Sequence, residues 1–326
     1  MTLVLVTGAS GLLGGSVAAE LLRRGHEVRT FQRRPSGIEG AQDATGSVTD
    51  PAAVVQALDG VEAVVHLAAR VSLAGDPAEF AAVNVGGTAV LLDAARAGGV
   101  SRFVYVSSPS VAHSGTSIVG DDARPADPRR ARGEYARTKA EAERVALAAD
   151  DPAFRVVAVR PHLVWGPGDT QLVGRIVDRA RAGRLPLLDH GTALIDTLYL
   201  DNAATGIAQT LERADVVHGN AYVLTNGEPR PVAELLSGIC LAAGVRPPTR
   251  SVPAGLARTA GSLIELGWRF RPGADEPPMT RFLAEQLSTS HWFDQRRTRR
   301  DLEWTPAVTL DEGFARLAAS YAAASR

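Results

Sequence analysis

The amino end of the chain carries the pattern that most restricts its fold: a short apolar run, a glycine-rich turn and an amphipathic segment. Leu3–Thr7 has the continuous apolar character of a strand that is buried on both faces. Glycines follow at 8, 11 and 14, and Leu12–Arg24 then shows helical apolar spacing that Gly25 closes. A strand, a tight turn and a helix in this order are typical of the first unit of a parallel sheet.

The spacing of the turn glycines indicates what the turn binds. Gly8 permits the tight turn, Gly11 lets the backbone approach a pyrophosphate, and Gly14 allows the helix to pack closely on the sheet. The free amides and the positive end of the helix then attract the diphosphate. A glycine-rich turn alone is common, and its place between a strand and a helix is what predicts a dinucleotide site here.

The same alternation of strands and helices continues through the first half of the chain. Further strands are predicted at residues 28–31, 63–67, 102–106 and 155–159, and helices at 51–58, 77–98 and 133–149. We therefore expect an α/β fold of Rossmann type, with a doubly wound, mostly parallel sheet and a smaller C-terminal substrate-binding lobe. The predicted dinucleotide-binding domain covers 1–165, with 194–228 returning to it in part, and the lobe covers mainly 166–326.

The end of the second predicted strand distinguishes NADP(H) from NAD(H). An NAD-specific site places a carboxylate about 20 residues after the glycines, where it accepts a hydrogen bond from the ribose 2′-hydroxyl. Here the neutral Gln32 stands at that point, followed by Arg33 and Arg34. Guanidinium groups pair with a 2′-phosphate, so the sequence favours NADP(H); a merely solvated arginine pair leaves NAD(H) as the alternative.

Two side chains four residues apart point to the chemistry. Lys139 is the single lysine among 35 basic residues, and it lies one helical turn after Tyr135, so both project from one helix face. The strand at 102–106 ends in Ser107 and Ser108, at the edge where open α/β sheets bind their ligands. A nearby ammonium lowers the pKa of a phenol, and a serine hydroxyl can hydrogen-bond an oxygen on which charge develops. The pattern predicts proton exchange with a carbonyl or alcohol oxygen.

Several motifs occur in order along the chain. They are TGASGLLG (7–14), HLAA (66–69), VNVGGT (83–88), VYVSS (104–108), YARTK (135–139) and RPHLVWGPGD (160–169). Together they resemble the extended short-chain dehydrogenase/reductase family, within the NAD-dependent epimerase/dehydratase superfamily. The later segments LIDTLYLDN (194–202), AYVLTNGE (221–228) and EPPMTRFLAEQLSTSHWFD (276–294) resemble its 3β-hydroxysteroid dehydrogenase-like branch, which includes bacterial 2-alkyl-3-oxoalkanoate reductases.

The resemblance implies a role for each matching residue. Tyr135 is the general acid/base, and Lys139 binds the nicotinamide ribose and lowers the pKa of Tyr135. The catalytic serine falls on Ser108, with Ser107 as the second choice, and Asn84 supports the site. The predicted cofactor-binding residues are Gly8, Ser10, Gly11, Leu12, Leu13, Gly14, Gln32, Arg33, Arg34, Ser47, Val48, Leu67, Ala68, Ala69, Tyr135, Lys139, Pro161 and Leu163.

The substrate side is less strongly marked. Ser108, His113 and His162 are the predicted substrate contacts, while a histidine in a loop is more often structural. Sugar-nucleotide enzymes of the family commonly place an arginine just before the aspartate that matches Asp196, where it holds the substrate diphosphate. This chain has the apolar Ile195 instead, which favours a largely apolar carbonyl or alcohol substrate.

Composition excludes several other classes of protein. With 35 basic and 36 acidic residues, the net charge of −1 offers no basic excess for a nucleic acid. Cys240 is the one cysteine, which excludes an internal disulfide, and no His/Asp/Glu cluster has metal-ligand spacing. The sequence lacks an 18-residue apolar stretch and its start differs from a signal peptide, so we expect a cytoplasmic protein without a membrane span. The resemblance implies a homodimer through the helices near 85–98 and 134–148.

Three functions remain open on this basis, and the first is favoured. It is an NADP(H)-dependent oxidoreductase that interconverts a ketone and a secondary alcohol on a steroid-like or long-chain 3-oxo compound. The second is a sugar-nucleotide epimerase or dehydratase with retained NAD. The third is a non-catalytic dinucleotide sensor, against which the pairing of Tyr135 with Lys139 argues, because a sensor has no need of an acidic phenol.

Overall fold

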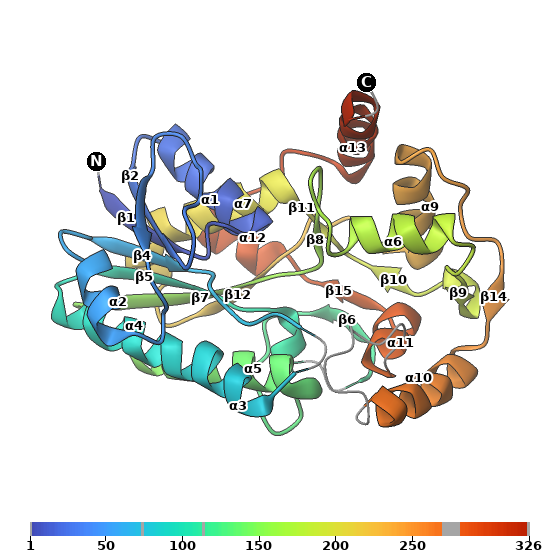
Figure 1. Cartoon of the computed structure of the whole chain (residues 1–326), viewed down its shortest axis with the longest axis horizontal. Coiled ribbons are helices and arrows are strands. Elements are labelled where there is room, and N and C mark those ends of the chain that lie inside the picture. The colour runs from blue at the N-terminus through green and yellow to red at the C-terminus, as the bar shows by residue number, and fades with distance from the viewer. Residues whose placement is uncertain (1, 73–74, 113–114, 269–280, 325–326) are drawn as a thin grey trace.

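The structure, a computed structural model, describes residues 2–72, 75–112, 115–268 and 281–324 and is built around a seven-stranded sheet (Figure 1). The strand order is β12-β7-β5-β4-β1-β2-β3, and each pair of neighbours is parallel. The strands are β1 (Leu3–Thr7), β2 (Glu27–Gln32), β3 (Gln42–Thr45), β4 (Ala63–His66), β5 (Arg102–Val106), β7 (Arg155–Pro161) and β12 (Ala221–Leu224). This arrangement confirms the predicted Rossmann-type, doubly wound fold.

Helices cover both faces of this sheet (Figure 1). One face carries α1 (Leu12–Arg23), α7 (Leu200–Glu212), α8 (Ala214–Val217) and α12 (Arg296–Leu302). The other carries α2 (Pro51–Ala57), α3 (Pro77–Phe80), α4 (Gly87–Ala97) and α5 (Gly133–Ala148). Each layer encloses its own apolar cluster, centred on Val4 and Val6 of β1 on the first face and on Leu5 on the second. The alternation of these neighbours follows from the two-residue period of a strand.

One of these helices would satisfy a length and hydropathy test for a membrane span. Residues Pro77–Ala97 form a continuous run of α3, the π-helical segment η1 (Ala81–Gly86) and α4, with a mean hydropathy of 1.2. Its side chains Leu91, Leu92 and Ala95 belong to the cluster under the sheet. Among the described residues this is the one helix that passes the test, and its packing is that of a core helix.

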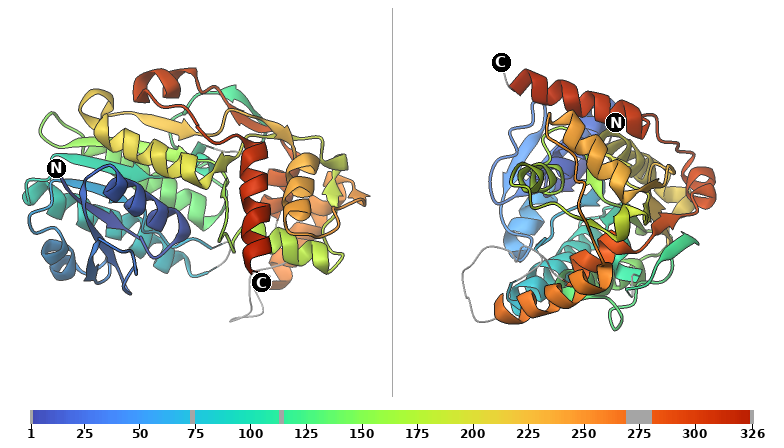
Figure 2. Two further views of the ribbon diagram at one scale, coloured as in Figure 1. Left: turned by 90° about the horizontal axis from the view of Figure 1, so that it is seen from above. Right: turned by 90° about the vertical axis from the view of Figure 1, so that its right-hand side faces the viewer.

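The second part of the chain forms a lobe beside the carboxyl ends of the strands. Its helices are α6 (Val173–Arg181), α9 (Val232–Ala242), α10 (Ala254–Trp268), α11 (Arg281–Ser288) and α13 (Leu310–Ala324). Its short strands are β8 (Val164–Trp165), β9 (Leu187–Leu188), β10 (Leu194–Ile195), β11 (Leu198–Tyr199), β13 (Arg230–Pro231), β14 (Ser251–Val252) and β15 (His291–Phe293). Figure 2 shows α13 lying along the boundary between the sheet and the lobe. There Phe314 of α13 stacks on Trp165 with ring centres 4.8 Å apart.

The chain crosses between the two parts more than once. Strand β12 pairs with β7 at the edge of the main sheet. In the opposite sense, β6 (Ile118–Asp121), which follows β5, joins the lobe's small sheet in the order β13-β10-β15-β6. Helix α12 then returns to the main sheet, where the Thr298 hydroxyl donates to the carbonyl of Val223. The lobe is therefore tied to the half that holds the main sheet from several points of the sequence.

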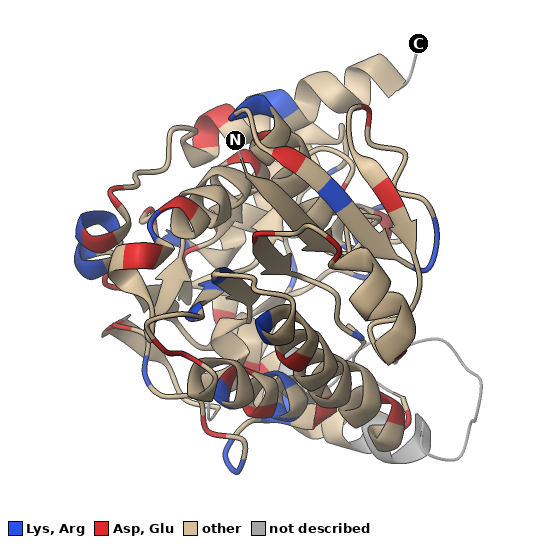
Figure 3. Ribbon diagram, turned by 90° about the vertical axis from the view of Figure 1, so that its left-hand side faces the viewer, with Lys and Arg blue, Asp and Glu red and all other residues tan. Residues whose placement is uncertain are grey.

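Charged residues of both signs alternate over the helices on the nucleotide-binding side. Figure 3 shows Lys/Arg and Asp/Glu positions interspersed on this side of the molecule rather than gathered into one patch. Many are paired on the same helix, as in the contact of Arg23 with Glu20 at 2.7 Å. The distribution agrees with the net charge of −1.

Candidate active site

The glycine turn lies at the carboxyl end of β1. Its backbone segments approach so closely that a side chain would not fit at two of the glycines. Gly8 has a positive φ of 75°, and a Cβ there would lie 2.9 Å from the backbone nitrogen of Ala68. A Cβ on Gly14 would lie 2.3 Å from the Gly8 carbonyl oxygen. Helix α1 therefore starts directly against the turn, and the amides of its first turn point to the open edge of the sheet. Residues Ser10, Gly11 and Leu12 are exposed there. The cradle fits a diphosphate.

The other predicted cofactor residues come from the same edge. In a parallel sheet all carboxyl ends meet at one side, and Leu67–Ala69 and Pro161 follow or end β4 and β7. Leu163, two residues beyond Pro161, has a φ of 47°, a left-handed conformation that a leucine adopts only under constraint. The strained residue is thus one that the resemblance places among the cofactor-binding residues.

The polar side chains at the end of β2 are joined by a network of hydrogen bonds. Gln32 is 7% exposed, and its amide donates to Thr30 and to Asp43 of β3. Asp43 Oδ1 also accepts from the Thr30 hydroxyl at 2.5 Å and from the backbone amide of Ser36 at 2.9 Å. These hydrogen bonds, that from Thr30 foremost, lower the pKa of Asp43. The carboxylate stays ionised and fixes the loop after β2.

That loop carries the arginine pair. Arg33 and Arg34 are both exposed, and within the described part of the chain neither forms an ion pair. Both guanidinium groups are therefore available to an anion from solution. Ser47, predicted near the adenine, has its hydroxyl 2.7 Å from that of Thr49, and Val48 is buried against Gly87.

Tyr135 and Ser108 are brought together by α5 and the turn after β5. Tyr135 lies in the first turn of α5, and the Ser108 hydroxyl lies close enough to its phenol to act to lower the pKa of Tyr135. Ser108 Oγ accepts from the backbone amide and the hydroxyl of Ser110, at 3.3 and 3.0 Å, which leaves its own hydrogen for Tyr135. Ser107 is instead buried beneath the turn, without a hydrogen-bond partner for its hydroxyl among the described residues. The structure thus joins Ser108, not Ser107, to the phenol.

The pKa of Tyr135 differs from the expectation drawn from the sequence. We expected Lys139 to lower it, whereas burial of the hydroxyl raises the pKa of Tyr135 to about 12, with the Ser108 hydrogen bond acting in the opposite direction. The effect of burial outweighs that of Ser108, and a pattern of residue types carries no measure of how far a hydroxyl is removed from water. The phenol therefore keeps its proton at neutral pH.

Lys139 is enclosed on the next turn of α5. It is 2% exposed, its Nζ donates to the carbonyl of Val106 at 2.5 Å, and it lies 4.2 Å above the ring centre of Tyr105. Burial lowers the pKa of Lys139 to about 7, while the negative charge of Glu143 acts to raise it. Near neutral pH this amine is thus poised between its charged and neutral forms.

Asn84 lies inside the π-helical segment η1 and joins two loops of the site. Its Oδ1 accepts from the backbone amide of Arg70 at 2.7 Å, and its Nδ2 donates to the Arg70 carbonyl and to the hydroxyl of Thr138. Thr138 stands between Tyr135 and Lys139 on α5. Asn84 therefore links the segment after β4 to the helix of the predicted catalytic pair, and π-helical turns are frequent at functional sites.

Sequence reasoning missed three polar residues that connect to Asn84. Thr7, His66 and Thr88 are 0–1% exposed and hydrogen-bonded to one another. Thr7 and Thr88 gave no signal, since threonine is ordinary in a strand or helix. The motif HLAA offered one, because a histidine at the end of a buried strand needs partners for both ring nitrogens.

Within the residues that the structure describes, the predicted substrate residues other than Ser108 are not seen to contact Tyr135. His162 is 6% exposed, its Nδ1 lies 2.7 Å from the carbonyl of Asp196, and its ring packs edge-on against Phe293. Its contact with a substrate stays a prediction, and His113 lies outside the described residues. Ile195 is 3% exposed in the apolar core of the lobe. That position thus packs the lobe and supplies no charge.

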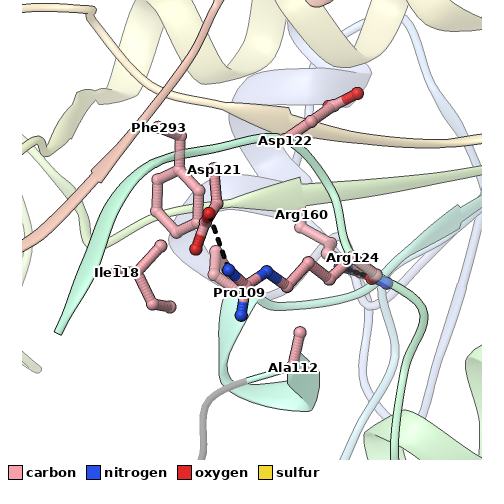
Figure 4. Close-up of a pocket in the computed structure, with 8 residues that line it drawn as sticks. All are labelled: Pro109, Ala112, Ile118, Asp121, Asp122, Arg124, Arg160 and Phe293. Atoms are coloured by element: carbon pink, nitrogen blue, oxygen red, sulfur yellow. Dashed lines mark hydrogen bonds and ion pairs between the residues drawn. The ribbon is translucent and has the colours of Figure 1, made fainter. Parts of the chain in front are cut away.

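A buried ion pair joins α5 to β7. Glu143 and Arg160 are each 1% exposed, and two nitrogens of the guanidinium meet the two carboxylate oxygens at 2.9 and 2.5 Å. Arg160 also donates to the carbonyl of Arg124, beside a small pocket next to the Ser108 turn. Figure 4 shows Arg124 reaching across this pocket to Asp121. The pair fixes α5 to β7 one turn after Lys139.

Neither a metal centre nor a thiol site is apparent among the residues that can be described. There, no group of three or more His, Cys, Asp or Glu side chains could hold a metal ion. Cys240 is buried in α9, and burial raises the pKa of its thiol.

Comparison with known proteins identifies the family. Residues 4–225 match the NAD dependent epimerase/dehydratase family. The chain belongs to this family. A 2-alkyl-3-oxoalkanoate reductase of Stenotrophomonas maltophilia is 40% identical over 98% of this chain and 99% of its own. A 3 beta-hydroxysteroid dehydrogenase/Delta 5-->4-isomerase of Mycobacterium tuberculosis is 32% identical over 95% of this chain and 88% of its own. The resemblance to the hydroxysteroid dehydrogenase-like branch is thereby confirmed.

Two solved structures share the fold over the whole chain. That of gox2253 has a TM-score of 0.79 at 27% identity, with 100% of this chain and 99% of the other covered. MoeE5 in complex with UDP-glucose and NAD has a TM-score of 0.76 at 25% identity, with 99% of both chains covered. The family is thus represented both by reductases close in sequence and by a sugar-nucleotide complex close in structure.

Proposed function

We propose that this protein is an NADP(H)-dependent ketoreductase that interconverts a ketone and a secondary alcohol on a largely apolar substrate. The observation that carries the proposal is the proximity of Tyr135 and Ser108 at the edge of the sheet that also presents the glycine turn. A phenol and a serine hydroxyl that share one site suit the oxygen of a carbonyl group. The curated relatives named as reductases and hydroxysteroid dehydrogenases support this choice of chemistry.

The residues divide the reaction between binding and proton transfer. The turn at Gly8–Gly14 and the start of α1 would hold the diphosphate, and the bound nicotinamide supplies or accepts the hydride. Ser108 donates a hydrogen bond to the carbonyl oxygen and orients it beside Tyr135. In the direction of reduction Tyr135 gives its proton to that oxygen and becomes a phenolate. Lys139, one helical turn away, supplies a cation that favours this phenolate.

The substrate we propose is a long-chain 3-oxo acid or a related ketone, with a steroid-like ketone as the near alternative. The lobe beside the site has an apolar core that includes Ile195, Trp165 and Tyr199. The names of the relatives, a 2-alkyl-3-oxoalkanoate reductase and a hydroxysteroid dehydrogenase, both describe bulky apolar substrates with one oxygen to be reduced or oxidised.

Cofactor selection is assigned to the arginine pair after β2. The exposed Arg33 and Arg34, on the loop fixed by Asp43, support a preference for NADPH because each can pair with a 2′-phosphate. Replacement of both by alanine is expected to weaken NADPH binding at least about tenfold and to leave NADH binding unchanged. Fluorescence titration with each cofactor measures this directly. Equal losses for both cofactors would refute the assignment.

The ketoreductase proposal is tested by NADPH oxidation with ketones of increasing chain length and ring count. Tyr135→Phe should abolish turnover and leave NADPH binding intact, because the substitution removes one hydroxyl and keeps the ring. Tyr321→Phe on α13 is the matched control and should behave as the wild type. Undiminished turnover by Tyr135→Phe would remove the basis of the mechanism.

A sugar-nucleotide epimerase is the second candidate, favoured by the structural likeness to MoeE5 in complex with UDP-glucose and NAD. It predicts that purified protein retains NAD and converts a nucleotide sugar without net consumption of cofactor. Failure of both observations, together with NADPH-dependent ketone reduction, decides for the reductase.

The assembly and the cellular place of the protein are further proposals. We propose a homodimer through the outer faces of α4 and α5, as the family resemblance implies. Light scattering coupled to gel filtration tests it, and a monomer at micromolar concentration would contradict it. A cytoplasmic location stays a prediction.

A further inference from the structure

A directed series of hydrogen bonds crosses the sheet edge beneath the proposed cofactor site. Thr7 Oγ1 accepts from the backbone amides of Leu67 and Ala68, at 3.1 and 3.0 Å. The same hydroxyl lies 2.7 Å from Nδ1 of His66, and Nε2 of His66 lies 3.0 Å from Thr88 Oγ1. Thr88 Oγ1 in turn donates to a backbone carbonyl at 2.6 Å. Each of these side chains is 0–1% exposed, so water does not replace the contacts.

The series can run in one direction only, because each hydroxyl has a single hydrogen. Thr88 uses its hydrogen on the carbonyl of Asn84, so it can only accept from His66, and Nε2 of His66 must carry the proton. Thr7 already accepts from two amides and therefore gives its hydrogen to Nδ1 of His66. Counting hydrogens thus fixes His66 as the neutral Nε2–H tautomer.

The far end of the series reaches the catalytic helix. Asn84, whose carbonyl accepts from Thr88, also donates through its side chain to the hydroxyl of Thr138 at 3.0 Å. Thr138 in turn donates to the carbonyl of Glu134 at 2.7 Å, one residue before Tyr135. At the near end, the backbone of Leu67 and Ala68 lies within 3.2 Å of where a Cβ of Gly8 would stand. The glycine turn, the end of β4 and α5 are therefore joined by one buried network.

We propose that His66 is a positioning residue of the reductase, which as its Nε2–H tautomer holds the Leu67–Ala68 segment in register with Asn84 and the catalytic helix. The inference rests on the proposed function for its catalytic consequence. The network connects the backbone that faces the cofactor to the helix that carries the proton donor, so it sets the distance between the two. A displacement of about 1 Å between reacting groups lowers a rate by about two orders of magnitude.

The tautomer is stable over the working pH range. Burial, and secondarily the nearby Lys139, lowers the pKa of His66 to about 3. A protonated His66 would carry hydrogen on both ring nitrogens and leave the hydroxyl of Thr7 without its acceptor. The directed series therefore persists at every pH at which the protein is assayed.

Nitrogen NMR of protein labelled with ¹⁵N-histidine tests the tautomer without any turnover. We expect one histidine with Nε2 protonated and Nδ1 unprotonated, unchanged between about pH 5 and pH 9, and identified by its loss in His66→Gln. An Nδ1–H tautomer, or titration within this range, would overturn the inference.

The positioning role is tested with a matched pair at Thr88. Thr88→Val keeps the shape of the side chain and removes the acceptor of His66, whereas Thr88→Ser keeps the hydroxyl. For Thr88→Val we expect kcat to fall about tenfold, with NADPH affinity changed less than about threefold. The primary isotope effect with NADPH deuterated at the transferred position should rise, and the amides of Leu67 and Ala68 should exchange faster with solvent. Thr88→Ser should retain wild-type values.

The outcomes separate this inference from the proposed function. If Thr88→Val binds NADPH stoichiometrically and keeps the wild-type kcat and isotope effect, His66 has only a structural role. If the wild-type protein reduces no ketone, the proposed function fails, while the tautomer and the amide exchange still decide whether the network exists as described.

Discussion

Replacement of the buried lysine by methionine is expected to make the protein more stable while it abolishes catalysis. Lys139 is 2% exposed, and burial lowers its pKa from 10.5 to about 7. Each tenfold change in the proton dissociation constant is worth about 1.36 kcal/mol, so holding this ammonium charged costs up to about 5 kcal/mol. Lys139→Met leaves the carbonyl of Val106 without this donor, which costs about 1–3 kcal/mol. We expect a net gain of about 3 kcal/mol at pH 6.

The gain in unfolding free energy from Lys139→Met should decrease as the pH rises. Below pH 7 the lysine is protonated in both the folded and the unfolded chain, so the wild type bears the full penalty. Between pH 7 and about 10.5 the unfolded chain keeps the proton and the folded protein does not, so wild-type stability from this group rises with pH. The advantage of Lys139→Met should therefore narrow steadily across this interval.

Thermal unfolding at pH 6 to 10, followed by fluorescence, measures the difference between the two proteins. Arg137→Met is the control, because Arg137 is on the same helix with its side chain 36% exposed and loses the same charge without a change in burial. Its unfolding temperature should differ from that of the wild type by a pH-independent amount. A Lys139→Met protein that is less stable at every pH, or whose advantage does not vary with pH, would refute the reasoning.

Two further substitutions test the framework of the site. Gly14→Ala places a Cβ 2.3 Å from the Gly8 carbonyl oxygen and should lower the unfolding free energy by about 1–3 kcal/mol. Gly11 has a φ of −86°, and a Cβ there would have its nearest contact at 3.4 Å. Gly11→Ala should therefore keep wild-type stability and lose cofactor affinity in a titration. Arg160→Met should lower the unfolding free energy by about 3–5 kcal/mol in chemical denaturation, because it leaves Glu143 charged and unpaired. The double variant Arg160→Met/Glu143→Leu should recover most of this loss. A double variant whose loss equals the sum of the two single losses would contradict the ion-pair argument.

The main sheet was predictable because its strands are buried on both faces. β1, β4, β5 and β7 are short apolar runs, and such runs identify strands of a parallel sheet without any knowledge of neighbours. β3 has the sequence QDAT and was not among the predicted strands, because at the edge of the sheet most of its side chains face water. An edge strand of this kind is defined by its backbone partner rather than by its own pattern.

The lobe was less predictable for a related reason. Its small sheet joins β6 to β15, whose residues Ile118 and His291 pair although they are far apart in the sequence. Each strand of this sheet has two to four residues, too few for an alternating pattern to show. Only the folded chain brings such segments together.

In the site, the sequence indicated which residue types meet but not the electrostatics of their surroundings. Ser108 and Tyr135 were expected at one place, and in the structure Ser108 lies near enough to the phenol to act on its pKa. The pKa of Tyr135 lies above its ordinary value and that of Lys139 below it, because burial favours the neutral form of each group. His66 and its threonine partners were not predicted, because a tautomer depends on which group donates each hydrogen bond. The spacing of residues in the sequence does not carry this information.

The surroundings of position 139 explain why the chain has a lysine there and arginine at its other basic positions. Elsewhere the chain uses arginine for every basic position, and a guanidinium stays charged even when buried. At position 139 the group is enclosed by the Val106 carbonyl and the Tyr105 ring, where a compact amine with a titratable charge fits. An amine can adjust its charge as phenol and phenolate interchange beside it, whereas a guanidinium cannot. Lys139→Arg should therefore lower the stability that Lys139→Met raises, although it is the substitution closest in charge.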